Sequence, residues 1–142
     1  MKHERIPRDK AGRFIGGTPR LAARRKREEE GIQRQIIAWC GFCLRRDVLI
    51  FSVPNESKRP PSQAATLKAM GLRPGAADLV MVHDGRCYFI ECKANDGDQS
   101  KAQQAFEHDA RLAGSSYRIV RSLAQFIEAL GDWGVPSREV RK

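Results

Sequence analysis

Two short apolar runs separated by a turn sequence form the clearest pattern in the chain. Residues 79–82 and 87–90 are strand-like, and the intervening segment 83–86 reads His-Asp-Gly-Arg. Asp-Gly between such runs predicts a two-residue type I′ hairpin, because that turn needs positive φ at both central positions. With Asp-Gly as the loop, the register places Asp78 directly opposite Glu91, with their Cβ atoms about 5 Å apart.

Helical spacing and capping residues predict three longer helices. Ile32, Ile36 and Trp39 follow the spacing of one helix face. Ser100 precedes Gln103 by three residues, which is the capping-box spacing at the start of a helix. The three helices are expected to begin near Leu21, Ser100 and Ser122 and to end near Arg45, Ala113 and Gly131.

The remaining pattern predicts two further strands and one long loop. The strands are expected at 47–53 and 117–120, and the loop at 55–75 carries a short helix around 64–70. Loops of this length inside compact domains are usually functional. The resulting order is α-β-β-β-α-β-α, and the crossover helix makes strands 88–92 and 117–120 parallel neighbours. The sequence therefore predicts an α/β fold with a mixed sheet flanked by helices.

The length and the charge distribution suggest one domain with a basic arm. The chain has 142 residues, which fits a basic N-terminal arm at 1–20, a domain at 21–132 and a C-terminal tail at 133–142. Residues 1–27 hold ten Lys and Arg against two acids, whereas the rest of the chain holds sixteen against fifteen. Such arms often bind nucleic-acid phosphates with little sequence preference, and the alternative is a solubilising tail.

Four cysteines allow three interpretations. Trp39-Cys40-Gly41-Phe42-Cys43 imitates a thioredoxin-type motif, but it falls near the end of a helix instead of between a strand and a helix. A zinc site needs a second close pair, and Cys87 and Cys92 point to opposite faces of one strand. We therefore expect buried free thiols in a reducing cytoplasm. No N-terminal apolar segment suggests secretion, and no run has membrane-spanning length.

The opposed carboxylates Asp78 and Glu91 are the main candidates for chemistry. Two like charges directly opposite each other are destabilising unless a cation neutralises them, and a divalent metal ion does so. Lys93 follows Glu91 by two residues and so shares its face of the strand. The alternative is a solvated pair of acids at a sheet end with a structural lysine, and the pattern D-x12-E-x-K is weak by itself.

Three longer segments carry a resemblance to a known family. VPNESKRPPSQAATLKAMGLRPGAADL at 53–79, YFIECKA at 88–94 and SKAQQAF at 100–106 resemble the VRR-NUC (virus-type replication-repair nuclease) family of the PD-(D/E)XK nuclease superfamily. The resemblance runs from about Glu28 to Leu130 and is greatest to the small stand-alone phage members. It implies a restriction-endonuclease-like fold. One departure is Ala77, where the family usually has proline before the metal-binding aspartate.

The resemblance also implies a set of site residues. Mg²⁺, with Mn²⁺ as a substitute, is held by Asp78 and Glu91, and the backbone carbonyl of Cys92 adds a third ligand. Lys93 orients or deprotonates the attacking water and offsets charge on the scissile phosphate.

The first helix and the helix after the catalytic strand supply further candidates. In the family, a first-helix acid a few residues before a glutamine helps to position the metal, and Glu29 with Gln33 has that spacing. Glu30 is an alternative and Glu28 remains open. Gln103 corresponds to the glutamine that follows the catalytic strand in the family, although closing the capping box with Ser100 is an alternative role.

These features predict a metal-dependent DNA endonuclease of phage or prophage replication and repair. The resemblance implies a homodimer that acts on branched DNA such as four-way junctions, in the cytoplasm of a bacterial or phage-infected cell. A two-fold dimer suits paired incisions in a two-fold junction. The alternative is a non-catalytic nucleic-acid-binding accessory protein. The candidate DNA-binding residues are Asn55, Lys58, Arg59, Arg24, Arg25, Lys26 and Arg27.

Overall fold

A computed structural model describes Lys10, residues 19–54 and residues 59–138 of the chain. The predicted N-terminal arm therefore lies almost wholly outside the described residues. The elements, in order, are α1 (Pro19–Cys43), β1 (Val48–Ser52), α2 (Pro61–Ala69), β2 (Leu79–His83), β3 (Arg86–Cys92), α3 (Lys101–Leu112), β4 (Ser116–Val120) and α4 (Leu123–Trp133). This order confirms the predicted α/β arrangement, with α2 as the short helix of the long loop.

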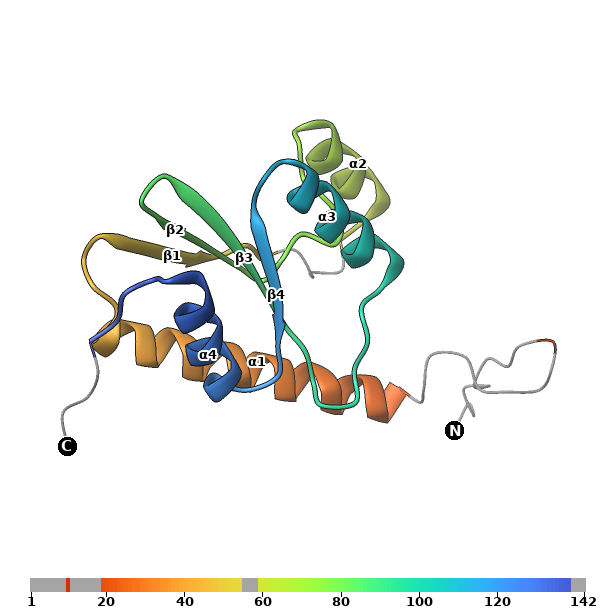
Figure 1. The fold of residues 1–142 in the computed structure, drawn as a ribbon. Helices are drawn as coiled ribbons and strands as arrows, with labels where there is room; N and C mark the ends of the chain where they lie inside the picture. The colour runs from red at the N-terminus through yellow and green to blue at the C-terminus, as the bar shows by residue number, and fades with distance from the viewer. Residues whose placement is uncertain (1–9, 11–18, 55–58, 139–142) are drawn as a thin grey trace.

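The four strands form one mixed sheet in the order β1-β2-β3-β4. β1, β2 and β3 are antiparallel, whereas β3 and β4 run parallel across the α3 crossover. The predicted parallel pair is thus confirmed. In Figure 1, α1 and α4 lie on one side of the sheet, and α2 and α3 lie on the other.

The β2–β3 hairpin has the predicted turn and register. Asp84 has a φ of 50° and Gly85 a φ of 71°, as a type I′ turn requires. Leu79 pairs with Ile90 and His83 pairs with Arg86. One further step along this ladder brings Asp78 opposite Glu91, as the sequence predicted.

Alternation along the strands gives the sheet two different faces. Leu79, Ile90 and Cys92 point into the main core, where Ile36 of α1 and Phe126 of α4 pack against them. On the other face, α3 covers β3 and β4, since the Phe106 ring lies 5.0 Å from that of Phe89 and 6.2 Å from that of Tyr117. Asp78 and Glu91 belong to this second face, at the end where β3 finishes.

The last helix extends further than predicted. α4 continues through Gly131 to Trp133 and is capped by Gly134, which has a φ of 70°. The extra turn is held because Trp133 packs on Tyr88, with ring centroids 4.9 Å apart, and Asp132 accepts a 2.9 Å hydrogen bond from Arg118. The predicted end at Gly131 is therefore wrong.

The chain after α4 also packs against the domain. Val135 is buried in the main core, Ser137 forms a bridge with Leu44, and the amide of Arg138 donates to the carbonyl of Cys43. The folded part therefore extends at least to Arg138, beyond the boundary expected at residue 132.

All four cysteines are free thiols, and three of them are buried as predicted, whereas Cys87 is only half-buried. Cys40 and Cys43 lie in α1 and are buried, and Cys87 and Cys92 are on β3. Burial, with a smaller contribution from Cys43, raises the pKa of Cys40 to about 12, the opposite of an activated redox thiol. Among the described residues, no helix is both long and apolar enough to cross a membrane.

Candidate active site

The Asp78 carboxylate lies where the β2–β3 ladder ends. Its Oδ2 accepts a 2.8 Å hydrogen bond from the Cys92 backbone amide, and its backbone carbonyl accepts a 2.9 Å bond from the Val53 amide. The side chain thus binds the next amide of β3, where β2 no longer supplies a carbonyl. This bond orients Asp78 toward the end of β3 that carries Glu91.

The Glu91 carboxylate is held by a side chain of α3, Gln103. Its Oε1 accepts a 2.9 Å hydrogen bond from Gln103 Nε2. Gln103 Oε1 accepts from the Ser100 amide at 2.8 Å, and Ser100 Oγ accepts from the Gln103 amide at 3.2 Å. The two roles considered for Gln103 coexist, because its carbonyl oxygen closes the capping box while its amide group orients Glu91.

Burial distinguishes this group of side chains from the rest of the described chain. In that part of the chain, the buried polar or charged residues are Glu91, Lys93 and Gln103, with exposed fractions of 1%, 8% and 7%. Moving a charge from water into the protein interior costs several kcal/mol, which is comparable to the free energy of unfolding of a whole domain. Buried charges without a function are therefore rare. All three are predicted catalytic residues.

Glu29 of α1 is the third carboxylate at the site. Its Oε1 accepts a 3.2 Å hydrogen bond from the Ala94 amide and lies 3.9 Å from Lys93 Nζ. Glu28 instead pairs with Arg24 at 2.5 Å, and Glu30 is exposed in a groove along α1. Of the three adjacent glutamates, the geometry favours Glu29.

Burial and three nearby carboxylates act together on the Cys92 thiol. Burial, followed by the charges of Asp78, Glu91 and Glu29, raises the pKa of the Cys92 thiol well above its usual value. Burial and then the charge of Glu91 likewise raise the pKa of Tyr117. The Cys92 side chain packs in the main core, so its thiol points away from the site as predicted.

The donor set fits a hard divalent cation. Carboxylate oxygens are the ligands that Mg²⁺ prefers, and a carboxylate that accepts one hydrogen bond keeps acceptor capacity for a metal ion. Within the described ranges, no three His, Cys, Asp or Glu side chains already form a complete metal cage. The metal-binding roles of Asp78, Glu91, Glu29 and the Cys92 carbonyl therefore stay predictions.

Arg121 was missed by the sequence reasoning. Its Nη1 donates to the carbonyls of Ala94, Asn95 and Gly97, at 2.5, 3.4 and 2.7 Å, and so fixes the loop that directly follows Lys93. Nothing local in the sequence indicates this contact, because 24 or more residues separate the partners.

Gly75 was also missed, although it lies in the segment that carries the family resemblance. It has a φ of 75°, and a Cβ atom there would lie 2.3 Å from the Ala102 carbonyl carbon and 2.6 Å from the Gln103 amide nitrogen. The backbone before β2 therefore touches the first turn of α3. This close approach fixes the distance between Asp78 and Gln103.

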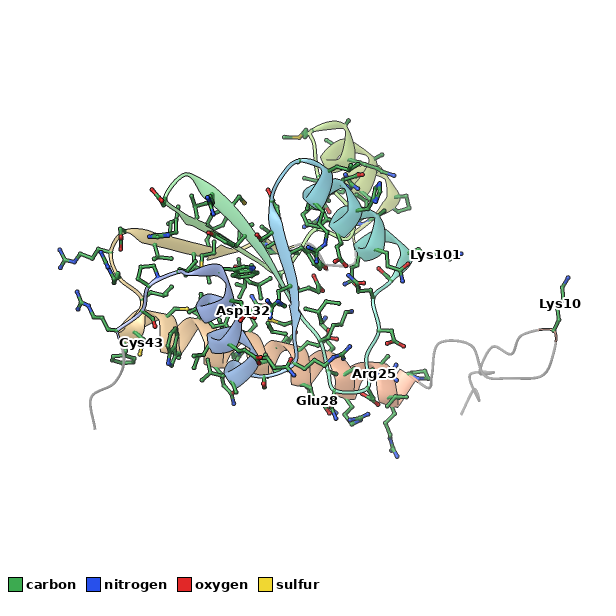
Figure 2. All side chains as sticks on the ribbon, in the orientation of Figure 1. Lys10, Arg25, Glu28, Cys43, Lys101 and Asp132 are labelled. Carbon is green, nitrogen blue, oxygen red and sulfur yellow. The ribbon has the colours of Figure 1, made fainter. Side chains whose placement is uncertain are left out.

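The same loop that Arg121 holds is bound from the other side by α1. The Asp96 carboxylate forms ion pairs with two arginines of α1. Its Oδ2 lies 2.6 Å from Arg24 Nη2, and its Oδ1 lies 3.3 Å from Arg25 Nε. Partial burial raises the pKa of Asp96, but hydrogen bonds from the two arginines outweigh it, and the net pKa is lowered. Figure 2 shows Arg25 and Glu28 near the end of α1 that the loop approaches.

The predicted DNA-binding residues divide into three groups. Arg24 and Arg25 are engaged with Asp96, whereas Lys26 and Arg27 are exposed on α1. Arg59 is half-buried before α2. The other two, Asn55 and Lys58, lie outside the described residues.

Comparison with solved structures reveals a protein of the same fold. A chain described as "VRR_NUC domain protein" superposes with a TM-score of 0.58 at 17% sequence identity, covering 79% of this chain and 93% of that chain. The restriction-endonuclease-like fold is therefore confirmed, and the VRR-NUC resemblance is confirmed at the level of the fold. No protein-family model matches the sequence, and no curated protein matches it.

Proposed function

We propose that this protein is a metal-dependent endonuclease that hydrolyses DNA phosphodiester bonds, with Mg²⁺ as its metal and Mn²⁺ as a substitute. The observation that most directly supports this function is the buried Glu91 carboxylate, which Gln103 orients beside Asp78 at one end of the sheet. A module that only binds nucleic acid has no need for opposed acids next to a buried lysine. The fold shared with a VRR_NUC domain protein supports the same function.

Each residue has a role that follows from its position. Asp78 and Glu91 would bind the metal ion directly, and the Cys92 backbone carbonyl would add a neutral oxygen ligand. Glu29 would help to position the metal ion. A bound divalent ion supplies charge neutralisation at the phosphate and a more acidic water. Lys93 is placed beside Glu29, from where its ammonium group stabilises the negative charge that develops on the phosphate.

We further propose that the enzyme is a homodimer acting on branched DNA, including four-way junctions. This proposal rests on the resemblance to stand-alone phage members and on the two-fold character of such junctions. On the basis of the same resemblance, we also propose that it acts in phage or prophage replication and repair, in the cytoplasm of a bacterial or phage-infected cell.

One cleavage assay tests the function. Purified protein is incubated with end-labelled linear, flap and four-way DNA in Mg²⁺, Mn²⁺ or EDTA, and the products are resolved on a denaturing gel. We expect cleavage with either metal ion, none in EDTA, and faster cleavage of branched DNA.

The Asp78→Asn protein is the matched control, because asparagine keeps the shape of the side chain and removes its charge. Equal cleavage by a well-folded Asp78→Asn protein and the wild type would overturn the assignment of Asp78 as a metal ligand. Tight DNA binding with no cleavage under any metal condition would favour the accessory-protein alternative.

A further inference from the structure

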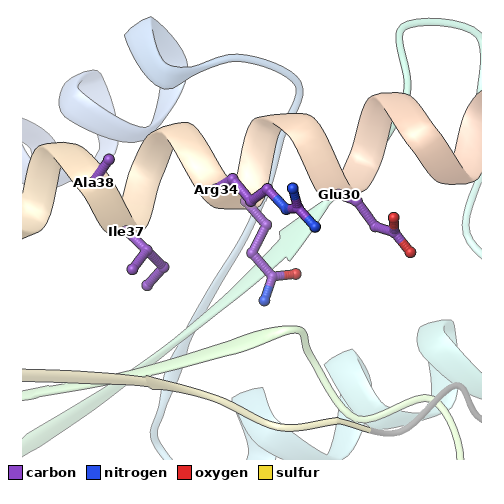
Figure 3. Close-up of a pocket in the computed structure, with 5 residues that line it drawn as sticks. Glu30, Arg34, Ile37 and Ala38 are labelled. Carbon is purple, nitrogen blue, oxygen red and sulfur yellow. The ribbon is translucent and has the colours of Figure 1, made fainter.

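An open groove of about 400 Å³ runs along one face of α1, lined by Glu30, Gln33, Arg34, Ile37 and Ala38. These positions repeat at the spacing of a single helix face. Figure 3 shows the labelled side chains following one another along the helix. The volume is within the range of about 300–1,000 Å³ that is typical of small-ligand sites.

The polar side chains of this groove have no partner in the described part of the chain. Glu30, Gln33 and Arg34 make no side-chain hydrogen bond or ion pair there. Glu30 and Arg34 are four residues apart and still do not pair, whereas Arg24 and Glu28, at the same spacing on the same helix, pair at 2.5 Å. The groove thus presents an uncompensated guanidinium, a carboxylate and an amide beside an apolar surface.

The groove begins next to the candidate active site. Glu29 lies beside Lys93, and Gln33 is one helical turn further along α1. Arg34 is five positions after Glu29, which is about 7.5 Å along the helix axis at about 1.5 Å per residue. Arg34 therefore lies on the same helix as Glu29, a short distance along α1 from the candidate active site.

We propose that this groove is a nucleotide-binding subsite for the substrate strand, next to the scissile phosphate. The inference rests on the proposed nuclease function and assigns a substrate contact to residues that the function itself does not require. Arg34 binds a flanking phosphate, since its planar guanidinium matches two phosphate oxygens. Gln33 and Glu30 bind polar groups of the base or sugar, and Ile37 with Ala38 contacts their apolar parts.

Binding measurements without turnover provide the first test. In an Asp78→Asn background, Arg34→Ala should weaken binding of a fluorescent DNA junction about tenfold, as for the loss of one charged hydrogen-bonding group. The log–log salt slope should fall by about 0.9, the value for one phosphate contact. Arg34→Lys should keep most of the slope. Arg86→Ala is the matched control, because Arg86 is also exposed but lies at the opposite end of β3.

A second measurement locates the ligand directly. Titration of deoxythymidine 5′-monophosphate into the Asp78→Asn protein should shift the NMR signals of amides 30–38, and Arg34→Ala should abolish these shifts. Shifts confined to other residues would overturn the proposal. So would equal losses of affinity in Arg34→Ala and Arg86→Ala, which would indicate a general charge effect.

Protein–protein contact at the groove is the competing outcome. If Ile37→Ser changes the oligomeric state in sedimentation and leaves DNA affinity unchanged, the groove belongs to a protein interface and the subsite is excluded. These tests do not depend on turnover. Absence of metal-dependent cleavage in the wild type would remove the nuclease proposal and leave the groove result standing.

Discussion

The Gln103 side chain connects the start of α3 to the Glu91 carboxylate, donating to it at 2.9 Å while accepting from the Ser100 amide at 2.8 Å. Helix capping and carboxylate orientation therefore depend on the two ends of one amide group. Any rotation of that group would break both bonds and leave a buried acid without its donor. Gln103 is accordingly a positioning residue that acts through Glu91.

The two functions of Gln103 can be separated by substitution. Gln103→Glu keeps an oxygen for the capping box, which accepts Glu at this position, but sets a second carboxylate against Glu91. Like charges raise the pKa of one member of such a pair, so the acid limb of the pH–rate profile should move to higher pH.

Ser100→Ala is the complementary control. It removes the cap alone and should lower the free energy of unfolding by about 1 kcal/mol with little change in the rate. Unchanged pH profiles in both proteins would contradict a positioning role for Gln103.

Asp78→Asn should abolish cleavage without unfolding the protein. The asparagine carbonyl oxygen can still accept from the Cys92 amide, and the repulsion between Asp78 and Glu91 is removed. In EDTA we expect a melting temperature equal to or above that of the wild type. Stabilisation by Mg²⁺, seen as a rise in melting temperature for the wild type, should be lost, since ligand binding stabilises only the state that binds it. An equal Mg²⁺ effect in both proteins would remove Asp78 from the metal site.

Lys93→Ala should reduce the cleavage rate by about 10²–10⁴-fold, the usual range for general acid–base or electrostatic catalysis. Metal affinity should remain close to that of the wild type, because lysine is not a ligand. Isothermal titration with Mn²⁺ measures the affinity, and Lys101→Ala is a control at an exposed lysine of α3. Loss of metal binding together with the rate would assign Lys93 a structural role.

Arg121→Ala should lower kcat more than it raises KM, because Arg121 holds the loop after Lys93 through its carbonyls. Arg121→Lys should recover part of the rate, since an ammonium group still donates to carbonyls. Arg118→Ala is the control three residues earlier, on β4, where the side chain pairs with Asp132 on the surface. Equal kinetic losses at both arginines would show a general effect of β4.

The basic segment before α1 is predicted to bind phosphates without regard to DNA shape. Deleting residues 1–18 removes five Lys and Arg and two acids and leaves α1 complete. Affinity for all DNA shapes should fall, and the salt slope should decrease by about 0.9 for each lost contact. Preference among linear, flap and four-way DNA should persist in gel-shift titrations. An unchanged affinity and slope would show that the segment does not bind DNA.

The parts of the fold that the sequence predicted are those with local causes. Asp84 and Gly85 have the positive φ values that their turn requires, so the register opposing Asp78 and Glu91 could be derived from the sequence. The end of α4 could not, because a glycine inside a helix is tolerated when tertiary contacts continue it. Here those contacts are the packing of Trp133 on Tyr88 and the hydrogen bond that Asp132 accepts from Arg118.

The candidate site was only partly accessible to the same reasoning. Glu91 lies on β3 and Lys93 directly follows that strand, so their spacing of two residues was enough to predict that they lie close together. Arg121 and Gly75 act across long stretches of chain, through carbonyl contacts and a backbone approach that no periodicity reveals. The choice of Glu29 over Glu28 and Glu30 required the position of the loop after β3, where the Ala94 amide donates to Glu29.

The contact of Gly75 with the first turn of α3 also limits how the chain can change in length. Because Gly75 is fixed against Ala102 and Asp78 is fixed against Cys92, the three-residue interval between them is anchored at both ends. An inserted or deleted residue there would shift the aspartate by one position and turn its side chain to the opposite face of the sheet. The segment between β1 and α2 has no such double anchor in the described residues. Related sequences are therefore expected to vary in length in that segment and to keep the Gly75–Asp78 interval constant.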